Sequence, residues 1–70
     1  MLVTIIYSEN MESNAKSLRS DVRAKWTDVN VNLMGTRRTL YQVQLEDRVV
    51  YSADSVTDNN SIIDLIEERL

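Results

Sequence analysis

The first third of the chain changes from a continuous apolar run to a helical repeat. Residues 2–7 read LVTIIY, a β-branched and apolar run typical of a strand in the middle of a sheet. A helix is predicted over residues 10–27, because its apolar positions recur at spacings of three and four: Met11, Ala15, Leu18, Val22 and Trp26. Ser8 or Asn10 is placed to cap the start of this helix. The order predicts a strand that leads directly into a helix.

The middle of the chain alternates between apolar and polar residues, which is the pattern of half-buried strands. Residues 29–33 read VNVNL and residues 41–45 read YQVQL. A tight turn is predicted at Glu46-Asp47, and residues 48–52 return as the second strand of a hairpin. A last helix begins at one of the capping residues 58–61 and carries the apolar residues Ile62, Ile63, Leu65, Ile66 and Leu70.

The element order βαβββα predicts one α/β domain over residues 1–70. The first two strands should be parallel, because a helix joins them. Since Asn30 and Asn32, like Gln42 and Gln44, alternate with apolar residues, one face of the mixed four-stranded sheet is expected to be wet. Both helices should then pack on the other face, as a two-layer sandwich. The predicted core includes Ile5, Leu18, Val22, Val31, Val43 and Ile66. The amide face is either a solvated surface or a binding face, with Leu2, Thr4 and Ile6 as its apolar part.

Several local features are also predicted. Gly35 is the only glycine and is the best candidate for a positive φ angle. The pairs Glu12–Lys16 and Asp21–Lys25 are spaced for ion pairs along the first helix. Three tyrosines are expected to be half-buried with the hydroxyl in water: Tyr7, Tyr41 and Tyr51.

Composition excludes several kinds of chemistry. The chain has no Cys and no His, so it lacks thiolates, imidazole bases and the usual ligands for zinc or copper. We expect no cofactor, no bound metal and no enzyme activity, because no base is available to activate Ser8. The net charge of −3 argues against nucleic-acid binding in general. No apolar run is long enough to span a membrane, so a cytoplasmic protein is expected.

Residues 40–52, LYQVQLEDRVVYS, together with the βαβββα order, resemble the selenoprotein W/Rdx group of small thioredoxin-like proteins. The matching positions are Tyr41, Val43, Val49, Val50 and Ser52, preceded by the loop at Gly35. The family has a Cys-x-x-Cys or selenocysteine turn after its first strand, and Ser8 and Met11 stand at those two positions. Asp47 also replaces the usual turn glycine. The resemblance therefore implies a thioredoxin-like fold without thiol–disulfide activity, since exchange requires a sulfur nucleophile.

The leading functional hypothesis is a non-catalytic thioredoxin-like protein-interaction module or small regulator. Its partner would be another protein, bound through the turn at residues 8–13, the loop at residues 35–38 or an edge of the sheet. Met11 is expected to be exposed at the tip of the turn, where methionine adapts to protein partners. The protein itself is expected to be a monomer or a weak homodimer. The candidate partner-binding residues are Ser8, Glu9, Asn10, Met11, Ser13, Arg37 and Arg38.

The alternative hypothesis is binding of an anion or nucleic acid. The groups that would carry it are Arg37 and Arg38, together with a basic stripe on the first helix formed by Lys16, Arg19 and Arg23. A solvated helix face that makes ordinary ion pairs is the simpler interpretation of the same residues.

Overall fold

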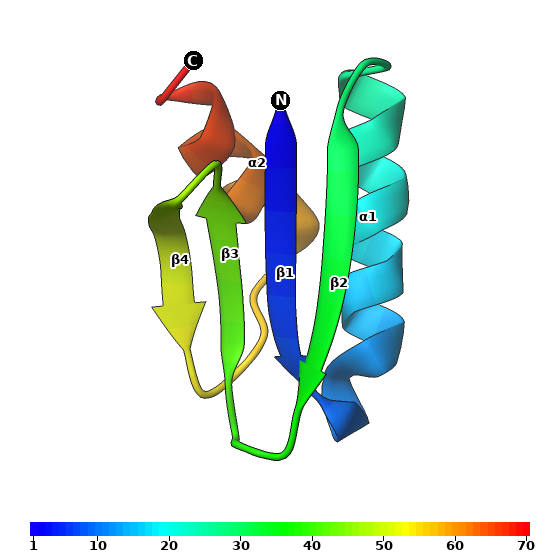
Figure 1. Ribbon diagram of the computed structural model, residues 1–70, viewed down its shortest axis with the longest axis vertical. Coiled ribbons are helices and arrows are strands. Elements are labelled where there is room, and N and C mark those ends of the chain that lie inside the picture. The colour runs from blue at the N-terminus through cyan, green and yellow to red at the C-terminus, as the bar shows by residue number, and fades with distance from the viewer.

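The computed structural model describes residues 1–70 and contains one mixed four-stranded sheet with two α-helices (Figure 1). The sheet order is β2-β1-β3-β4: β1 pairs with β2 in parallel and with β3 antiparallel, and β3–β4 is an antiparallel hairpin. The elements in chain order are β1 (Leu2–Ser8), the 3-10 turn η1 (Glu9–Met11), α1 (Glu12–Lys25), β2 (Asn30–Thr36), β3 (Tyr41–Leu45), β4 (Arg48–Ala53) and α2 (Asn59–Glu67).

Both helices lie on the same face of the sheet, as the alternation of amides predicted (Figure 1). The core between the two layers contains buried residues of β1, β3, β4 and both helices, whereas the inward residues of β2 are only half-buried. Five of the six predicted core residues have no exposed surface: Ile5, Leu18, Val22, Val43 and Ile66. Val31 is only half-buried, because β2 is an edge strand and has a neighbour on one side alone. Neither helix is both long enough and apolar enough to cross a membrane.

The two helices begin in different ways. The prediction that Ser8 or Asn10 caps the first helix is wrong, since η1 and α1 each begin without a side-chain cap. The 3-10 turn instead tightens the chain between β1 and α1. The carboxylate of Asp58 caps α2 by accepting from the Ser61 backbone N–H at 3.1 Å and from the Ser61 hydroxyl at 2.8 Å. These hydrogen bonds hold the pKa of Asp58 below its ordinary value.

The prediction for Gly35 is also wrong. No glycine has a positive φ angle, and Gly35 lies inside β2, which extends further than the predicted strand. The ring of Tyr7 lies across it, 3.8 Å from the position that a Cβ atom would occupy. The residue with positive φ is Glu46, at 56°, in the hairpin turn between β3 and β4. The tight turn therefore takes the left-handed conformation one residue before Asp47.

Three further side chains differ from expectation. Tyr41 is fully buried and its hydroxyl has no hydrogen-bond partner. Met11 is half-buried and packs against the core instead of projecting from the turn. Lys25 forms its ion pair with Glu67 of α2 at 3.2 Å, while the predicted partner Asp21 accepts a hydrogen bond from Asn59. In each case a tertiary neighbour replaces the solvent or the local partner that the sequence suggested.

Candidate functional site

Two of the segments predicted to bind a partner meet at one end of the molecule. β1 and β2 are parallel, so their carboxyl ends lie together, and Ser8 is opposite Thr36 in the register. The Ser8 backbone N–H also donates to the carbonyl of Leu40 at 2.8 Å, which fastens the following loop to the end of β1. The turn at residues 8–13 and the loop at residues 35–38 are thus neighbouring parts of one surface.

A polar hollow of about 360 Å³ lies between these two segments. It is lined by Ser8, Glu9, Asn10, Thr36, Arg37 and Thr39. We call this the carboxyl-end hollow. Its lining holds one carboxylate and one guanidinium and no hydrophobic residue. The hollow therefore offers hydroxyl, amide and charged groups to a partner.

The remaining predicted site residues lie beside the hollow rather than in it. Met11 is turned toward the core, and Ser13 is exposed in the first turn of α1. Arg38 is exposed, and its backbone N–H donates to the hydroxyl of Thr36 at 3.3 Å. The structure therefore brings Ser8, Glu9, Asn10 and Arg37 into one hollow and separates Met11 from them.

The basic residues of the alternative hypothesis do not gather in one place. Lys16 forms the predicted ion pair with Glu12, at 3.0 Å. Arg23 is near the carboxyl end of α1, at the opposite end of the molecule from the loop that carries Arg37 and Arg38 (Figure 1). Glu9 adds a negative charge to the hollow in which Arg37 lies.

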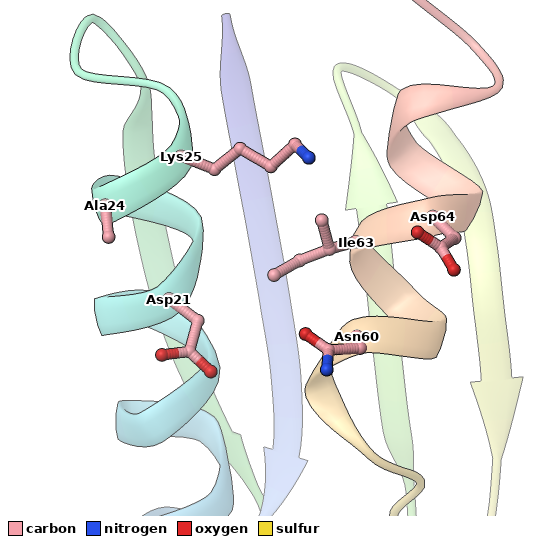
Figure 2. Close-up of a pocket in the computed structure, with 6 residues that line it drawn as sticks. All are labelled: Asp21, Ala24, Lys25, Asn60, Ile63 and Asp64. Carbon is pink, nitrogen blue, oxygen red and sulfur yellow. The ribbon is translucent and has the colours of Figure 1, made fainter.

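A groove of about 420 Å³ runs between α1 and α2 and was not predicted from the sequence. Figure 2 shows Asp21, Ala24 and Lys25 on one wall and Asn60, Ile63 and Asp64 on the other. Two of its charged groups already have partners. The amide of Asn59 donates to Asp21 at 2.8 Å and to the Ser17 hydroxyl at 3.0 Å, and Lys25 pairs with Glu67. Polar contacts across the groove thus connect the two helices. Nowhere in the molecule do three or more acidic side chains cluster where they could hold a metal ion.

The face of the sheet that the helices leave open has a distinct composition. In register across the strands lie Asn32, Thr4, Gln44 and Val49, and next to them Met34, Ile6, Gln42 and Ser52. With Leu2 and Asn30 at the near end of β1 and β2, these residues form what we call the open face. No charged side chain occurs among them, although charged residues make up 27% of the chain. Leu2, Met34 and Val49 are exposed to 38%, 50% and 46%.

The sequence contained the signal for this face, since the alternating amides of two strands fall on it. It did not contain the pairing of β1 with β3, which places Gln42 beside Ile6 and Gln44 beside Thr4. No protein-family model matches this chain. No curated protein is similar enough to match it either.

Proposed function

We propose that the protein is a non-catalytic protein-interaction module, a small regulator that binds another protein through the open face of its sheet. The observation that carries the proposal is the absence of charge on an exposed surface that includes Leu2, Met34 and Val49. The centres of protein interfaces are depleted in charged residues, and apolar groups there supply the favourable burial. The amides around them can hydrogen-bond to a partner without the cost of removing a charge from water.

The size of the open face supports a weak or transient interface. Four strands about 4.8 Å apart and roughly 20 Å long present a flat area near 400 Å². That area lies below the roughly 800 Å² that each partner contributes to a stable complex. The adjoining carboxyl-end hollow would extend the contact, because Ser8 and Thr36 continue the same strands.

A photo-crosslinking experiment tests the proposal. The crosslinking amino acid is placed at Met34 on the open face and, as a control, at Glu68 beyond the end of α2. Position 34 should yield a defined adduct with a protein of the native host, and position 68 should not. In the protein with the crosslinker at position 34, Val49→Asp should abolish capture because it places a charge in the interface. Ser20→Asp, which adds the same charge on the exposed side of α1, should not affect it. Equal capture by both variants would contradict a role for the open face.

The anion-binding alternative makes a different prediction for the same complex. Binding dominated by phosphate contacts weakens steeply as salt rises, whereas an uncharged interface changes little. Capture that disappears at moderate salt, and that depends on Arg37 and Arg38, would support the alternative.

We also propose that the domain is a thioredoxin-like relative that has lost its redox pair. Ser8 is the last residue of β1 and Met11 is the residue before α1, which is the arrangement of the family's two redox positions. Replacing both with cysteine should produce an intramolecular disulfide under mild oxidation while the fold is kept. If mass spectrometry finds only free thiols or intermolecular dimers, the match of Ser8 and Met11 to that pair is wrong.

A further inference from the structure

The two edges of the sheet are built differently. β4, at one edge, contains a bulge at Val50, since Gln44 pairs with Val49 and Val43 pairs with Tyr51, and it begins with the charged Arg48. Bulges and charges are the usual devices that prevent an edge from pairing with another strand. β2, at the other edge, has the sequence NVNLMGT, with no charge, no proline and no irregularity in its register. The β2 edge therefore has none of this protection.

The backbone of β2 offers a continuous row of unpaired groups. The Asn30 N–H donates to the carbonyl of Met1 at 2.8 Å, so alternate residues from Asn30 onward direct their backbone groups toward β1. Val31, Leu33 and Gly35 must then direct their N–H and C=O groups away from the sheet. These groups can bond to an added strand without disturbing the existing sheet.

The flank of α1 above this edge is basic. Ala15, Leu18 and Val22 face the sheet, and Asp21 and Lys25 face α2. At 100° per residue, Arg19 and Arg23 fall on the flank away from α2, together with Glu12 and Lys16, which pair with each other and leave a net charge from the two arginines. Figure 1 shows α1 behind the margin of the sheet at β2, so this flank overlooks the β2 edge. The two ion pairs of the protein involve Lys16 and Lys25, and neither involves Arg19 or Arg23.

We propose that β2 receives an extended acidic segment of another protein as a fifth strand. Alternate residues of that segment would carry carboxylates toward Arg19 and Arg23, and the residues between them would be uncharged and continue the open face. This inference rests on the proposed protein-interaction function and names the chemistry of the partner.

Two other occupants fit the edge less well. A second copy paired through β2 would place two α1 helices with the same basic flank over the new strand pair, and like charges in close contact are unfavourable. A nucleic acid would meet the arginines but has no ladder of amide groups to match Val31, Leu33 and Gly35. A peptide backbone satisfies both features.

The probe is a synthetic peptide of about eight residues, the length of a long strand, in which Glu alternates with Thr or Val. Hydrogen exchange is followed by NMR at each amide of β2 in the intact chain. In the free protein the amides of Val31, Leu33 and Gly35 should exchange fast and those of Asn32 and Met34 slowly. Peptide at millimolar concentration should slow the first set specifically. A peptide with Gln in place of Glu should bind more weakly.

Matched variants test the basic flank. Arg19→Gln with Arg23→Gln should weaken peptide binding roughly tenfold, as expected for the loss of two exposed ion pairs. Arg48→Gln with Arg69→Gln removes the same charge elsewhere and should leave the affinity unchanged.

Each contrary result has a definite meaning. Peptide binding without new protection at Val31, Leu33 and Gly35 would overturn the added strand. Protection that appears with protein concentration alone would identify a second copy as the occupant, and arginine-dependent binding of oligothymidine without peptide binding would identify an anion. If no peptide binds while crosslinking at Met34 persists, the edge inference fails and the proposed function stands. If crosslinking at Met34 also fails, both fail.

Discussion

The two faces of the sheet use the same strands for different purposes. Along β1, Val3 and Ile5 have no exposed surface beneath the helices. On the open face Leu2 and Ile6 keep part of theirs, although Thr4 between them is buried by its neighbours in the sheet. A two-layer sandwich buries only one face, so the residues on that face determine stability. The open face contributes less to folding, and its composition can therefore be set by binding. The lack of charged residues on the open face is therefore informative about binding, because charged residues are common in the rest of the protein.

The largest expected effect comes from two adjacent isoleucines on opposite faces. Ile5→Ala should lower the free energy of unfolding by roughly 3–4 kcal/mol, because it leaves a cavity between the sheet and the helices. Ile6→Ala should lower it by about 1 kcal/mol, since Ile6 is only half-buried and the gap is open to water. Urea denaturation of both variants measures the difference. Equal losses would show that the open face also supports the fold.

This difference between the faces was predictable from the sequence, because the period of two separates inward valines from outward amides. The depth of burial was not. Val31 follows the same pattern as Val43, yet only Val43 is fully buried, because strand order depends on long-range pairing. The partner of Lys25 was misassigned for a related reason: residues four apart on a helix are always available, but a carboxylate from α2 lies close enough to compete.

The candidate site was predicted in pieces. The turn after β1 and the loop after β2 were identified as separate segments, and the parallel βαβ order already requires their ends to meet at one edge of the sheet. The orientation of Met11 was not accessible, since it depends on how the 3-10 turn directs the chain into α1. The unprotected edge at β2 could not be predicted either, because it depends on the strand order of the sheet, which no local sequence pattern specifies.

A smaller change in stability is expected at the Tyr41 hydroxyl, on the face of the sheet that the helices cover. The Tyr41 hydroxyl is buried without a partner, and burial, reinforced by Tyr51, raises the pKa of Tyr41 from 10.0 to about 12. Tyr41→Phe keeps the ring and removes the unsatisfied group, so it should raise the free energy of unfolding by about 1 kcal/mol at neutral pH.

The pH dependence provides an independent check. A raised pKa means that the folded state holds the phenol proton more tightly than the unfolded state. This stabilisation is complete below about pH 10 and is lost as the pH rises from there through about 12. The Tyr41→Phe variant should lack this part of the alkaline loss. A variant that is less stable than wild type would indicate that the hydroxyl does have a partner in solution.

A still smaller gain in stability is expected from adding a side chain at Gly35. Gly35 has no positive φ angle and has room for a methyl group against the Tyr7 ring. Gly35→Ala should therefore raise the free energy of unfolding by roughly 0.5 kcal/mol, because alanine loses less backbone freedom on folding. Thermal and urea unfolding measure it. A clear loss would mean that Gly35 adopts a conformation closed to alanine.

The smallest effect is expected within the open face itself. The Ser52 hydroxyl donates to the side-chain oxygen of Gln42 at 3.0 Å, and the pair is exposed to water. Because water replaces such a bond at little cost, Ser52→Ala and Gln42→Ala should each change the free energy of unfolding by less than about 0.5 kcal/mol. The double variant should show no appreciable coupling between the two positions. Coupling above about 1 kcal/mol would mean that polar pairs on this face hold the strands together. The uncharged amides would then have a structural role, and their composition would no longer favour a binding surface.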